Sequence, residues 1–336
     1  MAYINDPTIR DKIWALSHQA DAGSGRSLET LLSGNDQLKG QEAQRLRNFY
    51  SSNCMEPSRD LDSYGRCLCI GELQSVQDDF QERVEQHETT GIPPEEARKK
   101  VADELYSLVW GPTKVPIYQL LYLATCFNTA DRENIILVMR WLINEVKVPV
   151  EGRDVLGTTA IHLTLSTKPG FDPEIAQILY DAGADVNTRN RCGINAAHEA
   201  TMVWEPNNQE RTALAAKAID WFLAHGGSLD IKDNDGVTAR TNVSLLEKRQ
   251  KQNKNMKPLF AAVERDRQRR QQLGDTACML CAHVPSGGKK LLTCSRCKTA
   301  KYCAPPRACQ KLDWPRHKVE CNKPTGTITN VKSGSK

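Results

Sequence analysis

Long apolar runs are missing from this chain. No stretch of its 336 residues approaches the roughly eighteen consecutive apolar residues that a membrane-spanning helix needs. The N-terminal segment has no uninterrupted apolar region either, since Asp6, Arg10 and Lys12 break it early. We therefore expect neither a transmembrane span nor a secretory signal.

An even distribution of cysteines along the chain, as a disulfide framework requires, is also missing. Of the 12 cysteines, seven lie between Cys278 and Cys321. Clustered cysteines favour metal binding in a reducing compartment, so we predict an intracellular protein of the nucleus or the cytoplasm. Cys54, Cys67 and Cys69 have no histidine at zinc-ligand spacing, and we interpret them as ordinary thiols.

Acidic residues are scarce in the C-terminal part. Residues 1–246 contain 24 Lys and Arg against 35 Asp and Glu, a net charge of −11. Residues 247–336 contain 21 against 6, a net charge of +15. A basic C-terminal part on an acidic body suggests an electrostatic role or an association between the two.

The first third of the chain predicts helices. With 39% hydrophobic and 26% charged residues, the composition fits two or three ordinary domains. Helices begin at Asp6-Pro7, an N-cap followed by proline, and at Pro93-Pro94. Apolar residues recur there at helical spacing, which indicates core-facing stripes. The stripes are Ile9, Ile13 and Leu16; Leu73, Val76, Phe80 and Val84; and Ala97, Val101, Leu105 and Leu108.

The middle of the chain repeats itself. A polar residue, two residues, a glycine and a helix start occur at 154–162 (DVLGTTAIH), at 190–198 (NRCGINAAH) and at 233–240 (DNDGVTAR). The glycines Gly157, Gly193 and Gly236 are 36 and 43 residues apart. Such repetition predicts a solenoid in which stacked helix pairs share one core.

This segment resembles ankyrin repeats, chiefly through Gly-x-Thr-x-x-His at 157–162 and Gly-Ala-Asp-Val-Asn at 183–187. The resemblance extends to 236 and weakens over 115–153, and Cys67–Phe80 has the pattern of an earlier degenerate unit. It implies a surface that binds proteins. It also implies that the histidines of the turns, at positions 162 and 198, are structural.

Residues 247–274 are strongly hydrophilic. Between Glu247 and Leu273, nine Lys and Arg stand against three acidic residues, with five glutamines. We interpret this stretch as a basic, solvated helical linker. The arginine-rich run 265–270 leaves open a nuclear-import or nucleic-acid-facing segment. No aromatic ring interleaves with those arginines, which argues against a platform for single-stranded nucleic acid.

Eight possible zinc ligands lie within 44 residues near the C-terminus. They are Cys278, Cys281, Cys294, Cys297, Cys303, Cys309, His317 and Cys321. Cys-x2-Cys pairs suit Zn–S geometry, and eight ligands complete two tetrahedral sites. The segment has too few large apolar residues to form a core without metal. The count leaves pairing in sequence or in a cross-brace open.

The ligand order, with Tyr302, Gln310 and Trp314, resembles a MYND-type zinc finger over residues 278–321. The resemblance implies a cross-brace. One zinc would be held by Cys278, Cys281, Cys303 and Cys309, and the other by Cys294, Cys297, His317 and Cys321. The chain departs from the family at Cys309, which follows Cys303 after five residues instead of the usual three. Eight ligands fill both coordination spheres, so we expect two structural Zn2+ ions and no catalytic one.

The resemblance further implies that Gln310 and Trp314 bind short proline-containing peptides. An indole face packs on a pyrrolidine ring, and extended proline segments lose little entropy on docking. The alternative role of Trp314 is to pack the core of the finger. Basic residues around the groove would favour acidic residues beside the motif. They are Lys289, Lys290, Arg296, Lys298, Lys301, Lys311, Arg316 and Lys318.

MYND fingers also occur in SET-type lysine methyltransferases, whose catalytic part continues well beyond the finger. Here 15 residues follow Cys321, and they are rich in Gly, Ser, Thr and Lys. We expect this tail to be disordered. No cofactor loop or paired carboxylates stand out upstream. The sequence therefore predicts a protein that is not an enzyme.

The sequence thus predicts a mainly α protein, an irregular ankyrin-repeat helical solenoid with N-terminal helices plus a small C-terminal cross-brace two-zinc domain. The expected parts are N-terminal helices at 1–110, repeats at 111–246, a linker at 247–274, the finger at 275–323 and a tail at 324–336. The leading hypothesis is an adaptor in transcriptional regulation, whose solenoid and finger each bind proteins. The alternatives are a nucleic-acid-associated regulator that uses the basic C-terminal part, and a finger that docks on its own solenoid.

Overall fold

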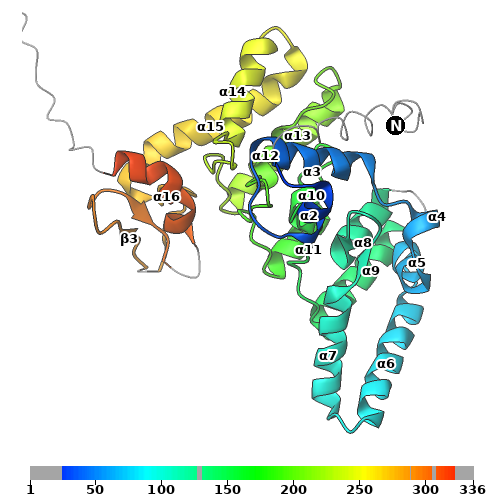
Figure 1. Ribbon diagram of the computed structural model, residues 1–336. Helices are drawn as coiled ribbons and strands as arrows, with labels where there is room; N and C mark the ends of the chain where they lie inside the picture. Colours follow the sequence, from blue (N-terminus) through cyan, green and yellow to red (C-terminus); the bar gives the residue numbers. More distant parts are fainter. Residues whose placement is uncertain (1–24, 127–130, 288, 305–307, 322–336) are drawn as a thin grey trace, which may run out of the picture.

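Helices dominate the computed structural model, which describes residues 25–126, 131–287, 289–304 and 308–321 (Figure 1). The helix start expected at Asp6-Pro7 and the expected tail lie outside these residues. The α-helices are α2 (Leu28–Ser33), α3 (Gly40–Ser52), α4 (Pro57–Asp60), α5 (Ser63–Ile70), α6 (Leu73–Thr89), α7 (Pro94–Ser107), α8 (Ile117–Cys126), α9 (Arg132–Trp141), α10 (Ala160–Thr164), α11 (Pro173–Asp181), α12 (Ala196–Thr201), α13 (Gln209–Ala224), α14 (Ala239–Arg249), α15 (Lys257–Leu273) and α16 (Cys309–Glu320).

Short elements complete the chain. Two antiparallel ladders pair β1 (Val109–Trp110) with β2 (Val115–Pro116) and β3 (Leu292–Thr293) with β4 (Lys301–Tyr302). The π-helix η2 (Leu142–Val146) continues α9, and the 3-10 turns η3 (Lys254–Met256) and η4 (Gly274–Thr276) flank α15. In the described part of the chain, no helix is both long and apolar enough to cross a membrane.

In the described part of the chain, four tight turns lie in a row and define the repeats. They span 111–114, 154–157, 190–193 and 233–236, and in each the fourth N–H donates to the first carbonyl over 2.8 to 3.2 Å. The second residue of each later turn donates its N–H to the third residue of the turn before. These bonds are Val155 N to Thr113 O (3.1 Å), Arg191 N to Leu156 O (2.8 Å) and Asn234 N to Cys192 O (3.0 Å). The turns therefore form a continuous hydrogen-bond ladder.

The fourth position of every turn has a positive φ, which explains the recurring glycine. Gly157, Gly193 and Gly236 have φ of 73°, 80° and 88°. The first turn carries Lys114 at this position, with φ of 53°. A left-handed lysine is unfavourable relative to glycine. This departure hides the first turn from the sequence pattern and accounts for the weak resemblance of residues 115–153.

In three of the repeats, those of α8, α10 and α12, the third residue of the first helix bonds to the residue directly after the next turn. His162 Nε2 lies 3.2 Å from Ile194 O, and His198 Nε2 lies 3.2 Å from Val237 O. The Nδ1 atom of each ring accepts the backbone N–H of the N-cap residue of its own helix, so Nε2 carries the proton and donates. Burial lowers the pKa of His162 to about 4, which keeps it neutral. The structure thus agrees with a structural role for both histidines. In α8 the same bond comes from Gln119 Nε2, 2.5 Å from Thr158 O.

Five helix pairs stack side by side along this ladder within the described residues. The first helices, α5, α8, α10, α12 and α14, contact one another in that order, and their partners are α6, α9, α11, α13 and α15. One main core runs through the stack from Met55 to Val263. The array therefore begins with the pair α5–α6, which contains the segment Cys67–Phe80 that has the pattern of a degenerate unit. The hairpin α6–α7 projects from it (Figure 1).

The expected solvated linker is instead the outer helix of the last repeat. Helix α15 packs on α13 and buries Leu259, Ala262 and Val263 against the main core. Its Asp266 is also buried and bonds Arg240 (2.5 Å) and Arg270 (2.9 Å). The high charge of this segment predicts a solvated helix. A narrow apolar stripe, with paired charges beside it, is nevertheless enough to pack the helix against the core.

Residues 26–52, which we call the N-terminal strap, lie across the turns. They comprise α2, a loop and α3, drawn in blue in front of α10–α12 (Figure 1). The strap has its own small core with the turns, separate from the main core. It consists of Leu31, Leu38, Ala43 and Leu46 of the strap with Leu156, Cys192 and Ile194 of the array.

Asp154, the first residue of the second turn, makes stability depend on pH. Burial raises the pKa of this carboxyl to about 7, although it accepts N–H bonds from Leu156 and Thr158. The folded protein thus keeps a proton that an unfolded aspartic acid loses near pH 4. Stability then falls as pH rises from about 4 to 7 and is level above that range.

Asn190 fills the equivalent position with an uncharged amide that accepts the same two N–H bonds. We therefore expect Asp154→Asn to raise the unfolding free energy above pH 7 by about 2 to 4 kcal/mol. It should also flatten the pH dependence in urea denaturation between pH 5 and 8. The matched control is Asp233→Asn at the half-exposed fourth turn. Equal pH slopes for wild type and Asp154→Asn would contradict the assignment.

Candidate zinc centres and peptide surface

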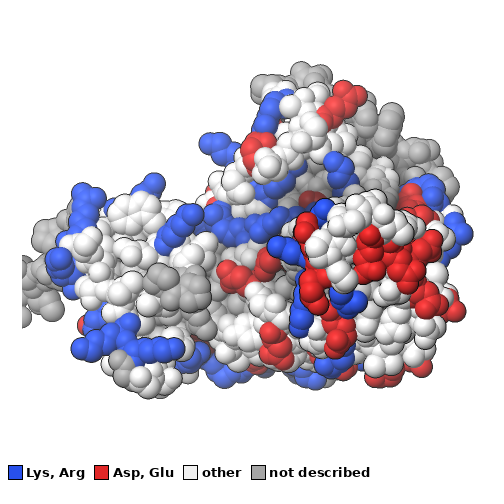
Figure 2. All heavy atoms as spheres, turned by 90° about the horizontal axis from the view of Figure 1, so that it is seen from below, with Lys and Arg blue, Asp and Glu red and all other residues white. Residues whose placement is uncertain are grey.

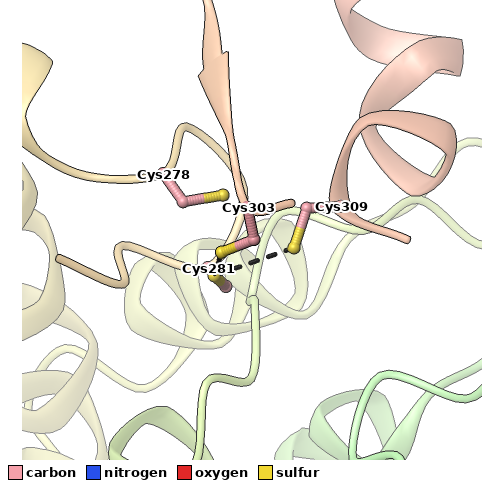
Figure 3. Close-up of side chains that lie close together, drawn as sticks. All are labelled: Cys278, Cys281, Cys303 and Cys309. Carbon is pink, nitrogen blue, oxygen red and sulfur yellow. Dashed lines mark hydrogen bonds between the residues drawn. The ribbon is translucent and has the colours of Figure 1, made fainter. Parts of the chain in front are cut away.

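The first group of ligands comes from three separate segments. Cys278 and Cys281 lie in the loop after α15, Cys303 follows β4, and Cys309 opens α16 (Figure 3). The four sulfurs lie within 4.8 Å of one another, and all four side chains are buried. Cys281 Sγ is 3.5 Å from Cys303 Sγ and 3.8 Å from Cys309 Sγ.

The second group interleaves with the first along the chain. It joins Cys294 and Cys297, in the loop between β3 and β4, to His317 and Cys321 at the end of α16. Cys294 Sγ lies 3.9 Å from Cys321 Sγ. His317 Nε2 lies 3.4 Å from Cys294 Sγ and 3.5 Å from Cys297 Sγ. The two groups are the quartets that the cross-brace predicts.

These distances fit tetrahedral zinc. With Zn–S of about 2.3 Å and Zn–N of about 2.0 Å, tetrahedral ligands are separated by roughly 3.8 Å for two sulfurs and 3.5 Å for sulfur and nitrogen. The observed separations of 3.4 to 3.9 Å match both values. A set of four cysteines, or of three cysteines and one histidine, belongs to a closed structural site. The chain therefore has two structural zinc sites.

Cys309 joins the first group despite its longer spacing. Its sulfur lies within reach of the other three, at the N-terminus of α16. Residues 305–307 of the insertion lie outside the described part of the chain. His283, a spare histidine between the first two cysteine pairs, is half-buried and belongs to neither group.

Both Cys-x2-Cys loops have the same backbone. The residue after the second cysteine is left-handed in each, with φ of 53° at Ala282 and 59° at Lys298. Its N–H donates to the carbonyl of the first cysteine, at 2.9 Å for Cys278 and 3.0 Å for Cys294. In the second loop, hydrogen bonds from the backbone of Ala300, then from Thr299, lower the pKa of Cys297 to about 5. The loop thus favours the thiolate that zinc binds.

A buried acid holds α16 on the β3–β4 hairpin. Asp313 accepts the Tyr302 hydroxyl at 2.7 Å and pairs with Arg316 through two bonds of 2.7 Å. Tyr302 is fully buried, so this matched position is a packing residue. Nothing in the sequence pattern marks Asp313 for this role, because acidic residues on helices are usually solvated.

Comparison with known proteins decides the identity of this segment. A family model described as MYND finger matches residues 278–321. The segment is a MYND finger. The histone-lysine N-methyltransferase SMYD3 of Homo sapiens is 46% identical over 43 residues, 13% of this chain and 10% of that protein. SMYD3 of Mus musculus is 43% identical over 44 residues, with the same coverage. The chain thus spans about a tenth of these curated relatives.

A solved structure extends over more of the chain. An ankyrin repeat domain from Acinetobacter baumannii AYE covers 60% of this chain and 98% of its own, with 16% identity and a TM-score of 0.34. The assignment of ankyrin-like repeats comes from the turn ladder and the stacked helix pairs, not from this superposition.

Gln310 and Trp314 share one exposed face of α16 in the MYND finger. They are four residues apart, and Trp314 is 39% exposed. A ring wholly committed to the core of the finger would be covered, so part of the indole is available to a ligand. Among the predicted basic residues, Arg316 is instead bound to Asp313. Figure 2 shows blue basic side chains on the finger, at the left, and many of the red acidic ones on the other half.

The finger is fixed to the last repeat. Arg270 of α15 donates to the carbonyls of Met279 (3.3 Å) and Leu280 (2.9 Å), between the first two zinc ligands. Arg269 donates to Ala282 O at 3.3 Å. Ile231 of the array packs into the core of the finger. Sequence reasoning treated these arginines as a basic run and missed their structural bonds.

Zinc content tests the two centres. We expect two zinc ions per chain by native mass spectrometry, and one in Cys309→Ser, because a neutral hydroxyl replaces a thiolate ligand. Each structural site contributes on the order of 10 kcal/mol to folding of the finger. A strong chelator should therefore unfold the finger while most helical circular dichroism of the array remains. The control is Cys192→Ser, a buried thiol outside both groups. Two zinc ions in Cys309→Ser would contradict the first quartet.

Proposed function

We propose that this protein is an intracellular, non-enzymatic adaptor in transcriptional regulation, whose ankyrin array and MYND finger each bind a protein. The observation that supports this most is the exposed face at Gln310 and Trp314, beside two zinc sites that each have four protein ligands. All eight ligands are used, which leaves no open position for a catalytic water. The similarity to SMYD3 is confined to the finger and supports no methyltransferase activity here.

The finger is suited to a proline-containing peptide with acidic neighbours. Trp314 offers an aromatic face and Gln310 an amide one turn away, on a helix fixed by the Asp313 bonds. A rigid platform lowers the entropy lost on binding. The surrounding lysines are exposed or half-buried. They would attract acidic residues on either side of the proline motif.

The nucleic-acid alternative has less support. Arg265 bonds Asp220 (2.7 Å), Arg267 bonds Glu264 (2.7 Å), and Arg270 bonds Asp266 (2.9 Å). Each of these carboxylates offsets the charge of one arginine, which weakens the local positive potential that would attract phosphate. The arginine run of α15 is therefore a weak candidate for a nucleic-acid surface.

A pull-down with the full chain tests the role of the finger. Gln310→Ala combined with Trp314→Ala should lose a subset of the partners of the wild-type protein, because both contact groups disappear. Loss of an aromatic anchor and its neighbour weakens binding by about 2 kcal/mol or more, roughly thirtyfold. The control is Val319→Ala, an exposed apolar residue on the same helix. Both proteins should retain two zinc ions. An unchanged set of partners would exclude this surface.

A further inference from the structure

The N-terminal strap contacts the array as a ligand does, from outside a finished core. Among the described residues, the main core contains none before Met55, and the strap shares only the small separate core with the turns. An open cleft of about 440 Å3 lies where the loop of the strap, near Gly34 and Gln37, meets the turns at Lys114 and Arg191. An open groove therefore borders the contact between the strap and the turns.

The turns hold the backbone of the strap at Leu38. Its N–H donates to Arg191 O over 2.7 Å, and its carbonyl accepts from Asn234 Nδ2 over 2.7 Å. Gly40 N donates to Asp235 Oδ1 over 2.8 Å. Bonds to both backbone groups of one residue are typical of the capture of an extended segment.

A second anchor lies earlier in the strap, in α2 and in the loop that follows it. Arg191 Nη1 donates to Leu31 O at 2.8 Å, and its Nε donates to Asp36 O at 3.1 Å. The side chains of Leu31 and Leu38, 0% and 1% exposed, fill the small core. Arg191 Nη2 lies 3.6 Å from Asp36 Oδ1. Among the described residues it finds no hydrogen-bond partner. The contact therefore combines hydrogen bonds to the strap backbone with a guanidinium nitrogen, Nη2, that makes only a long ion pair.

Arg191 and Asn234 occupy the same place in successive turns, the second residue. From this place Arg191 offers its carbonyl and its guanidinium to the strap, and Asn234 offers its side-chain amide. Two successive repeats thus hold the strap through residues at one equivalent position.

We propose that the strap is a displaceable intramolecular ligand, and that the turn edge beneath it binds a partner segment of the same pattern, two leucines seven residues apart with an acidic residue two before the second. In this chain the pattern is Leu31, Asp36 and Leu38. The inference rests on the proposed protein-binding role of the array and names its surface and its regulation. A tethered strap acts at an effective concentration of the order of millimolar, so a partner must compete with it. The apparent affinity of the partner is its intrinsic affinity multiplied by the fraction of molecules in which the turn edge is free.

Release of the strap in the full-length protein tests this. Leu38→Asp places a charge in the small core, and we expect hydrogen exchange of residues 26–52 to rise at least tenfold while α10 and α12 keep their protection. A fluorescein-labelled peptide of residues 25–53 should then bind the variant at least tenfold more tightly than the wild-type chain. The matched control is Gln41→Asp, which adds the same charge at an exposed position three residues on. It should behave as wild type. A peptide that itself carries Leu38→Asp should not compete.

Two results would overturn the proposal. One is faster exchange throughout α10 and α12 in both Leu38→Asp and the milder Leu38→Ala, which would make the strap an integral part of the array. The other is unchanged peptide binding after the strap is released. Both measurements use only this chain and its own peptide. Their outcome is therefore independent of the partner pull-down that tests the adaptor function and the finger.

Discussion

The hydrogen bonds between successive turns are the constraint on which the rest of the molecule depends. Each turn presents one N–H to the carbonyl of its predecessor, as in the bond from Arg191 N to Leu156 O. This contact fixes the spacing and the direction of the repeats. In the last two turns, the side chain of the second residue, Arg191 or Asn234, also holds the strap through hydrogen bonds.

Regular repeats could be predicted from the sequence only where the local chemistry was itself regular. Gly157, Gly193 and Gly236 announce a positive φ, and the pattern found those turns. The first turn satisfies the same geometry with Lys114 and the same inter-repeat bond with Gln119, and neither substitution carries a signal in a single sequence. The outer helix of the last repeat, α15, was missed for another reason, because several of its charges are paired in space with residues distant along the chain.

The finger was predicted more completely than the array because metal ligands are few and their order is specific. The zinc quartets emerged from the resemblance, and the structure brings the same residues together, including Cys309. The seating of the finger could not be predicted, since it depends on Arg270 reaching the carbonyls of a zinc loop and on Ile231 entering the finger from the array. The sequence shows only a run of arginines. In the folded protein, some of these arginines bond to groups inside the molecule and not to a partner.

The buried Asp266 joins these parts into one mechanical unit. It binds Arg240 of α14 and Arg270 of α15 at once, and Arg270 continues to the zinc loop. The ion pairs of a buried carboxylate between two guanidinium groups are costly to break, because loss of one partner leaves an uncompensated charge. The finger therefore keeps a fixed orientation toward the array. A partner segment bound at Trp314 is consequently held at a defined position relative to the turn edge. If one protein carries motifs for both surfaces, binding at the exposed finger raises its effective concentration at the covered edge. If both proposals hold, the exposed face of the finger binds first, and the strap is displaced from the turn edge second.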